Sequence, residues 1–273
     1  MNTGFVQAGL VKLQYFEHGS GPETVVLVHG YQSSGRIWRL TQEALDPARF
    51  RTIAISNRGA GDSDRTSGEA GYGIPQFAAD LNAAVTSLGV RDFTLVGHSL
   101  GGKTVTQFTL DHQDLVKALV LLDSGSLDGR PLTPGWEDEV RAAFPRRPGA
   151  ADERPAPLET PPPADFKAAL DADIDRNPIE RMIGSRRSMA DMQLRSRAGE
   201  LRMPVLVVGG DQDKTVGIDV ILTDFLTLPA GRRYLHVLHG AGHSPNVTRA
   251  GELATVLSQF VLTTVPAALA AAR

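Results

Sequence analysis

Six short hydrophobic segments alternate along the chain with longer segments in which apolar residues recur every three or four positions. The short segments are nearly continuous in their hydrophobicity, which is typical of strands covered on both faces. They are Thr24–His29, Arg51–Ser56, Asp92–Gly97, Lys117–Leu122, Pro204–Gly209 and Arg232–Leu238. The longer pattern predicts amphipathic helices, for example over Ile74–Leu88 and Leu253–Val261. The alternation predicts βαβ units, and therefore an α/β fold with a mostly parallel central sheet flanked by helices.

A seventh strand is expected nearer the N-terminus. From Val11 to Glu17, in VKLQYFE, apolar and polar residues alternate. Alternation leaves one face of a strand in water, which is common in antiparallel pairs. We therefore expect this segment to form an antiparallel strand at the edge of the sheet.

The alternation of strands and helices breaks after the fourth of the six hydrophobic segments. Residues 130–165 hold nine of the seventeen prolines, and proline interrupts both helices and central strands. From Phe166 to about Leu201 the pattern is helical and rich in arginine. We therefore expect one α/β core, formed by residues 1–124 and 203–273, with a largely helical insertion over residues 125–202.

The composition excludes several classes of function. With 28 basic and 31 acidic residues the formal charge is −3, so a general nucleic-acid binder is not expected. The chain has no cysteine, which excludes disulfides, thiolate metal sites and a cysteine nucleophile. We expect no membrane association and a cytoplasmic location, because neither a signal-peptide pattern nor a run of about 20 apolar residues is seen. We also expect no cofactor and no metal, since no phosphate loop, dinucleotide fingerprint or metal-binding histidine spacing occurs.

The clearest chemical motif is Gly97-His98-Ser99-Leu100-Gly101, followed by Gly102. It is a G-x-S-x-G sequence that directly follows a buried strand and precedes a helical pattern from about Lys103. A serine at such a sharp turn projects above the sheet edge, and residues two positions away must lack bulk for the turn to close. The motif also occurs by chance as a plain turn. In this context it predicts that Ser99 is a nucleophile.

A serine nucleophile needs a base, and seven histidines are available. His243 lies in the glycine-flanked loop Gly240-Ala241-Gly242, after the last strand and before the last helix. Such a loop can bring an imidazole over the serine, which favours His243, with His239 as the nearest alternative. His98 is expected to point away from the serine and His29 to brace loops, and the other three histidines are read as packing or surface residues.

The base needs an acid that orients it, and three aspartates are candidates. Asp211 and Asp213 follow the strand that ends at Gly209, and Asp123 ends the strand before it. The order Ser99, Asp213, His243 matches the Ser-Asp-His order of one particular fold. Asp213 is favoured, while Asp211 is suited to capping the turn. The oxyanion hole is expected to consist of the backbone N–H groups of Tyr31 and Leu100.

Taken together, these motifs resemble those of the α/β-hydrolase superfamily, in its branch of single-domain esterases and lactonases. The segments that carry the resemblance are HGYQSSGRIW, NRGAGDSD, GHSLGG, GGDQD and GAGH, in that order. The resemblance implies that the insertion is a cap over the active site. It also implies that Asp213 occupies the family's G-x-x-D position. It places Asp123 at the acid position of a minority of the superfamily, and Trp38 at the usual aromatic downstream of the oxyanion loop.

Two features depart from the resemblance. Relatives commonly carry an aspartate two residues before the arginine of the R-G-x-G-x-S turn, and Ser56 stands there in this chain. The nucleophile position holds Ser99 rather than aspartate, which argues against the epoxide hydrolases and haloalkane dehalogenases of the superfamily.

The insertion offers substrate-binding candidates that also have a simpler explanation. Seven arginines lie at positions 176, 181, 186, 187, 195, 197 and 202. They form either a solvated face or a guide for an anionic substrate. Met182, Met189 and Met192 are candidates for a pliable pocket roof, with core packing as the alternative. Tyr31 and Trp38 are candidates from the core, and for Tyr31 the alternatives are a hydrogen bond to the substrate and a purely structural place in the pocket wall.

The sequence predicts a serine hydrolase that acts on a small carboxylic ester or lactone through an acyl-enzyme, with the triad Ser99, Asp213 and His243. The first alternative is a C–C bond hydrolase of diketone-type ring-cleavage products. A cofactor-free dioxygenase acting on heteroaromatic rings is a further alternative. A ligand receptor that keeps the triad without turnover belongs to a different class. The substrate and the oligomeric state are not predicted.

Overall fold

The computed structural model describes residues 1–146, 156 and 158–271, and an eight-stranded sheet runs through them. The strand order is β1-β2-β4-β3-β5-β6-β7-β8, and β3 to β8 run parallel to one another. The strands are β1 (Asn2–Ala8), β2 (Val11–His18), β3 (Glu23–Val28), β4 (Phe50–Ile55), β5 (Phe93–His98), β6 (Val116–Leu122), β7 (Val205–Gly210) and β8 (Arg233–Leu238). The expected α/β fold with a mostly parallel sheet is confirmed.

The N-terminal strands differ from the expectation. β2 is antiparallel, as the alternation predicted, but it is not the edge strand because it lies between β1 and β4. β1 forms the edge and pairs with β2 along its whole length, from Asn2 opposite Glu17 to Ala8 opposite Val11. Only Val6 and Ala8 of β1 are buried, which explains why its hydrophobic pattern is weak.

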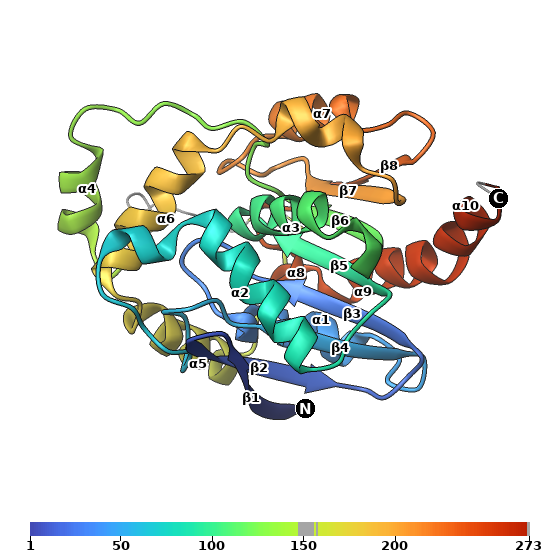
Figure 1. The fold of residues 1–273 in the computed structure, drawn as a ribbon, viewed down its shortest axis with the longest axis horizontal. Coiled ribbons are helices and arrows are strands. Elements are labelled where there is room, and N and C mark those ends of the chain that lie inside the picture. The colour runs from blue at the N-terminus through green and yellow to red at the C-terminus, as the bar shows by residue number, and fades with distance from the viewer. Residues whose placement is uncertain (147–155, 157, 272–273) are drawn as a thin grey trace.

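Helices cover both faces of the sheet (Figure 1). Because successive side chains of a strand point to opposite faces, Val26 and Val28 of β3 lie in one buried cluster, and Val25 and Leu27 lie in another. The first cluster includes residues of α2, α3 and α7, and the second includes residues of η1 and α9. The helices of the core are η1 (Gly35–Trp38), α1 (Arg39–Ala44), η2 (Glu69–Tyr72), α2 (Ile74–Ser87), α3 (Leu100–Asp111), η3 (Gln113–Leu115), α7 (Ile218–Thr227), α8 (Pro245–Thr248), α9 (Ala250–Gln259), η6 (Phe260–Thr264) and α10 (Val265–Ala271).

The chain leaves the sheet between β6 and β7, although these two strands are direct neighbours. The excursion contains α4 (Trp136–Ala143), α5 (Ala164–Asp175) and α6 (Ile179–Asp191), and η5 (Arg195–Glu200) follows it. Figure 1 shows α4 and α6 on the side of the molecule opposite α10.

The excursion is shorter than the expected insertion over residues 125–202. Leu127 at its start and Leu194, Ala198 and Leu201 at its end are buried in the core cluster that contains α2 and α3. An antiparallel bridge between Asp128 and Gln193 closes its base. The boundaries therefore move inward to Asp128 and Gln193, because apolar residues on either side of this bridge pack with the sheet.

The C-terminal helical segment also departs from the expectation. Ala250–Ala271 forms a 22-residue helical run that contains an 18-residue window with a mean hydropathy of 1.7, which is long and apolar enough to cross a membrane by length and composition alone. Leu253, Leu257 and Val261 on this run are buried against the second core cluster. Core helices of soluble proteins pass the same test, so the run is weak evidence for a membrane span.

Candidate active site

Ser99 stands alone between β5, which ends at His98, and α3, which begins at Leu100. Its backbone has φ 55° and ψ −121°, a strained conformation for a residue with a side chain. Glycine is required on both sides of the turn. A Cβ on Gly97 would lie 2.4 Å from the carbonyl oxygen of Gly101, and a Cβ on Gly101 would lie 2.5 Å from the carbonyl oxygen of Val28. The glycines therefore let the chain close tightly enough to raise the serine above the sheet.

His243 joins Ser99 to Asp213. Its Nε2 lies 3.1 Å from Ser99 Oγ, and its Nδ1 lies 2.8 Å from Asp213 Oδ2. The other carboxylate oxygen of Asp213 accepts the backbone N–H groups of Thr215 (2.7 Å) and Val216 (3.1 Å). Burial works to raise the pKa of Asp213, but the hydrogen bonds from His243 and the two N–H groups outweigh it and hold the pKa below its ordinary value. Asp213 is thus an ionised partner for the imidazole.

The other two candidate aspartates do not contact His243. Asp211 accepts hydrogen bonds from His239 Nδ1 (2.7 Å) and from the backbone N–H of Gly240 (2.7 Å). Asp123 is fully buried, and one of its oxygens accepts the backbone N–H of Gly210 at 2.8 Å. Burial raises the pKa of Asp123 well above its ordinary value, and the negative charge of Asp213 adds to the effect.

The other histidines near the site have different surroundings. The side chain of His239 is 85% exposed and bound to Asp211, so it is not brought to Ser99. His98 points away from the serine and donates its Nε2–H to the carbonyl oxygen of His243 at 2.7 Å. Burial, and then the neighbouring His243, lower the pKa of His98 to about 3, so its ring is neutral. His29 is also neutral, since burial lowers its pKa well below the ordinary value, and its Nε2 accepts the backbone N–H of Asn57.

The loop after β3 lies against the serine. A Cβ on Gly30 would be 3.0 Å from Ser99 Cβ, which is tighter than most real contacts, so glycine eases this approach. Tyr31, the next residue, is held at two points by α6. Its hydroxyl donates to the carbonyl oxygen of Met182 (2.7 Å), and its own carbonyl oxygen accepts Nη1–H of Arg181 (3.0 Å). The two residues expected to form the oxyanion hole, Tyr31 and Leu100, thus flank Ser99 from the β3 loop and from the start of α3.

Arg181 is a residue whose position the sequence did not reveal. Its side chain is fully buried, and Nη1 also contacts Asn177 Oδ1. No carboxylate among the described residues pairs with it, and its Nε and Nη2 have no hydrogen-bond partner there. Burial lowers the pKa of Arg181 to about 10, which still leaves a positive charge at neutral pH. A buried cation therefore holds the carbonyl of Tyr31.

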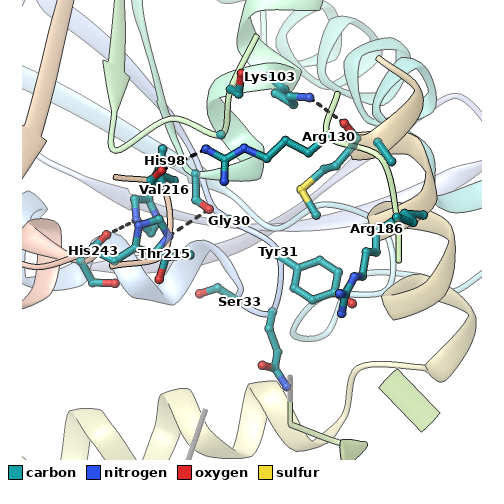
Figure 2. Close-up of a pocket in the computed structure, with 18 of the residues that line it drawn as sticks. Gly30, Tyr31, Ser33, His98, Lys103, Arg130, Arg186, Thr215, Val216 and His243 are labelled. Atoms are coloured by element: carbon teal, nitrogen blue, oxygen red, sulfur yellow. Dashed lines mark hydrogen bonds between the residues drawn. The ribbon is translucent and has the colours of Figure 1, made fainter. Parts of the chain in front are cut away.

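Ser99 and His243 open onto a cavity of about 620 Å³. Figure 2 shows His243, Thr215 and Val216 on one side of this cavity, and Tyr31 and Arg186 on the other. Apolar side chains from the core and the excursion form much of the wall: Ile37, Leu132, Leu170, Ile174, Met189 and Val216. A mostly apolar cavity with a few polar groups is typical of small-molecule sites.

The pocket corrects three of the expected substrate contacts. Tyr31 and Met189 line it, whereas Trp38, Met182 and Met192 do not. Trp38 is fully buried beside His98, with its ring edge-on to the imidazole at a centroid distance of 6.4 Å. Met182 is fully buried with Val140 and Ile183. Packing is therefore the better explanation for these three residues. Within the described part of the chain, no cluster of three or more acidic, histidine or cysteine side chains is placed to hold a metal ion.

Comparison with known proteins identifies the family. Residues 23–250 match the family model described as alpha/beta hydrolase fold, so the chain belongs to the α/β-hydrolase family. The match confirms the resemblance carried by the five sequence motifs. The fold is also similar to that of an esterase from Exiguobacterium antarcticum, with a TM-score of 0.82 and 20% identity over 95% of this chain and 99% of that one. At that identity the likeness extends to the fold alone.

Curated relatives cover several activities. The chain is 32% identical over 158 residues to epoxide hydrolase 3 of Siraitia grosvenorii, which covers 55% of this chain and 49% of that protein. It is 32% identical over 148 residues to 2-(acetamidomethylene)succinate hydrolase of Mesorhizobium japonicum, which covers 54% of this chain and 49% of that protein. The chain thus spans about half the length of these relatives. The family supports an enzyme of the hydrolase superfamily and leaves the bond that it cleaves open.

Proposed function

We propose that this protein is a serine hydrolase that cleaves a carboxylic ester or lactone through an acyl-enzyme, with Ser99, His243 and Asp213 as its catalytic triad. The observation that carries the proposal is the unbroken chain of hydrogen bonds from Ser99 Oγ through His243 to Asp213, opening onto the 620 Å³ cavity. A nucleophile, a base and an orienting acid in this arrangement are what acyl transfer requires.

In the proposed reaction, Ser99 Oγ attacks the ester carbonyl carbon while His243 Nε2 takes the hydroxyl proton. The carbonyl oxygen becomes an oxyanion, which the backbone N–H groups of Tyr31 and Leu100 stabilise. Asp213 stabilises the imidazolium. The tetrahedral intermediate collapses, His243 returns the proton to the leaving alcohol, and an acyl-serine remains. A water molecule, deprotonated by His243, then attacks the acyl-serine and releases the carboxylic acid and Ser99.

The names of the relatives raise epoxide opening as an alternative to this proposal. One relative is named an epoxide hydrolase, but in this chain the elbow position holds Ser99. The superfamily resemblance implies that the nucleophile of its epoxide hydrolases is an aspartate. A neutral serine with a hydrogen-bonded histidine base instead suits attack on an acyl carbon. The relative named as a hydrolase of an acetamidomethylene succinate is consistent with acyl transfer.

The direct test replaces Ser99 by alanine. We expect Ser99→Ala to lower kcat for p-nitrophenyl esters by on the order of 10⁶, because the nucleophile is lost while the fold is retained. A fluorophosphonate probe is expected to label wild type at Ser99 and to leave the variant unlabelled. Undiminished ester turnover by the variant would refute the proposal. Cleavage of a vinylogous diketone with poor ester turnover would instead identify a C–C bond hydrolase.

A matched pair of histidine variants tests the base. His243→Ala is expected to remove most of the activity, because His243 Nε2 contacts Ser99 Oγ. His239→Ala serves as the control, since His239 lies in the same loop region but is exposed and bound to Asp211. If His239→Ala were the inactive variant, the assignment of the base would be wrong.

We also propose that the excursion between Asp128 and Gln193 is a cap that sets substrate preference. It supplies much of the pocket wall, including Leu132, Leu170 and Met189. Joining Asp128 to Gln193 by two glycines is expected to leave a cooperatively unfolding core with altered or lost ester selectivity. Loss of cooperative unfolding in thermal melts would show that the excursion is an integral part of the core.

A further inference from the structure

Within the described part of the chain, three cationic side chains line the candidate active-site pocket without forming an ion pair. They are Lys103 of α3, Arg130 of the segment after β6 and Arg186 of α6. The acidic residue among the described residues of the wall is Asp128, and its carboxylate is paired with Arg195 at 2.8 Å. No ion pair among the described residues includes any of these three side chains, although the carboxylates of Asp224 and Asp128 act on Lys103 at longer range. Among the described residues that line the pocket, positive side chains therefore outnumber negative ones, which favours a positive potential.

Arg130 lies on the triad side of the pocket (Figure 2) and has unused hydrogen-bonding capacity. Its Nη2 donates to the carbonyl oxygen of Val216 at 3.2 Å, in the segment that follows Asp213. Figure 2 shows the guanidinium extending across the pocket toward Val216, above Gly30 and on the side of His243. A guanidinium has five N–H donors, so most of them are available to a bound molecule. The donor group thus belongs to the wall of the same pocket as Ser99 and His243.

Lys103 places a second charge behind this position. It is nearly fully buried, and its Nζ donates to the carbonyl oxygens of Met189 (2.7 Å) and Asp128 (3.4 Å). Burial lowers the pKa of Lys103 to about 8; the carboxylates of Asp224 and Asp128 oppose this effect, and the charge of Arg130 adds to it. Since this pKa is above 7, Lys103 is mostly protonated at neutral pH.

Other arginines of the excursion and its base show how the chain treats such residues elsewhere. Among the described residues, six of them pair with carboxylates: Arg141, Arg146, Arg176, Arg187, Arg195 and Arg197. Arg187 is the immediate neighbour of Arg186 on α6, yet it pairs with Glu69 and Glu137. Arg186 instead faces the pocket and lies 5.7 Å from the centre of the Trp136 ring. The solvated-face interpretation therefore fits the paired arginines and fails for Arg186.

We propose that the pocket takes an anionic substrate, an ester whose acid or alcohol part carries a carboxylate, and that this carboxylate binds the guanidinium of Arg130. Arginine binds a carboxylate through two parallel N–H···O bonds, which makes it suited to this role. Arg186 and Lys103 strengthen the positive potential from the opposite wall and from behind. The inference rests on the proposed function, because the same cavity holds Ser99.

Two matched pairs of esters test the inference on the whole protein. In the first, 4-acetoxybenzoate carries a carboxylate on the alcohol part, and its methyl ester is the neutral match. In the second, mono-4-nitrophenyl adipate carries it on the acid part, with methyl 4-nitrophenyl adipate as the match. We expect wild type to favour the anionic member of at least one pair by about tenfold or more in kcat/KM.

The variants assign the preference to named side chains. Arg130→Met keeps the length of the side chain and removes its charge, and is expected to lower the anionic-to-neutral ratio by about ten- to hundredfold. Arg186→Met is expected to lower the ratio by about threefold, because the charge of Arg186 acts on the substrate carboxylate at longer range. Arg187→Met is the matched control and is expected to leave the ratio unchanged. A wild-type ratio near one in both pairs, or a ratio that survives Arg130→Met, overturns the inference.

A binding measurement separates this inference from the proposed function. Adipate is titrated calorimetrically into Ser99→Ala, with and without Arg130→Met. Binding that depends on Arg130 supports the anion site even if neither ester pair is hydrolysed, in which case the proposed function alone fails. Ester turnover that depends on Ser99, combined with no adipate binding and no charge preference, refutes the anion site and leaves the proposed function standing.

Discussion

Replacing Asp213 by asparagine keeps the shape of the side chain and changes which of its two outer atoms accept hydrogen bonds. One carboxylate oxygen of Asp213 accepts the N–H groups of Thr215 and Val216, and the other accepts from His243. In the Asn variant, the amide oxygen is expected to remain with the two N–H donors. The amide NH₂ group then faces His243 Nδ1, which has to act as an acceptor. The proton of the neutral ring moves to Nε2, where it prevents His243 from accepting the proton of Ser99.

The magnitude follows from the cost of turning the amide round. The reversed orientation leaves two N–H groups unsatisfied, at about 1–3 kcal/mol each, or about 2–6 kcal/mol together. Since about 1.4 kcal/mol is a factor of ten, the competent orientation is disfavoured by about 30-fold to about 2 × 10⁴-fold. Loss of the negative charge beside the imidazolium lowers the rate further. We therefore expect kcat to fall by about 10³–10⁴, as is typical when a triad acid becomes an amide.

Release of p-nitrophenolate from one ester measures this effect, with thermal melts to show that each variant is folded. Asp211→Asn and Asp123→Asn are the matched controls, because they make the same chemical change on either side of the triad. Both are expected to stay within about tenfold of wild type, since neither aspartate contacts His243. The reasoning is refuted if Asp213→Asn keeps more than about a tenth of kcat. If Asp123→Asn is the crippled variant, the acid is Asp123.

Three further predictions concern residues around the triad. As pH rises, Asp123→Asn is expected to become more stable relative to wild type. Burial raises the pKa of Asp123 in the folded state. The protonated carboxyl therefore contributes stability to wild type below the unfolded-state pKa, and this contribution is lost as pH rises to the folded-state pKa. Melting temperatures across pH 4–8 measure this, and a constant gap would contradict it. Arg181→Met is expected to lower kcat by about tenfold with a smaller change in KM, because the carbonyl of Tyr31 loses a buried donor; Arg181→Lys is the charge-retaining control, and an unchanged kcat for Arg181→Met would argue against the positioning of Tyr31. Gly101→Ala is expected to lower the free energy of unfolding by about 1–3 kcal/mol in denaturant titrations, because the new Cβ meets backbone atoms of β3. Gly251→Ala on α9 is the control: its Cβ meets no atom within 4 Å, so it is expected to be neutral or stabilising. Equal stabilities of the two variants would contradict the packing argument.

Hydrophobic patterning predicted the parallel part of the sheet because buried strands carry a strong local signal. The same reasoning missed β1, in which only Val6 and Ala8 are buried and which includes Gly4 against the ring of Tyr15. A strand of this kind is held by its pairing with β2 rather than by burial of its side chains. Its absence from the prediction also led to the wrong edge assignment for Val11–Glu17.

The candidate site was predictable where a residue's role depends on its neighbours in sequence. Ser99 could be found because glycines two positions away make the turn possible. Which side chains of α6 face the pocket could not be found in this way. Met182 and Met189 are separated by two helical turns and share one face, yet Met189 lines the cavity and Met182 is buried near Tyr31. Segments distant in sequence decide what covers each turn of a helix. The surroundings of Arg181 and Arg186 could not be predicted for the same reason.

The bridge between Asp128 and Gln193 has a consequence for how such an enzyme can be redesigned. The excursion leaves and re-enters the core at one point, while β6 and β7 pair directly with each other. Lengthening a chain segment whose ends already meet costs only roughly 0.6 kcal/mol per doubling of its length. The excursion is therefore suited to replacement by a foreign segment. A segment joined at Asp128 and Gln193 would replace the pocket wall around Leu170 and Met189 and leave the strand register beneath Ser99 unchanged.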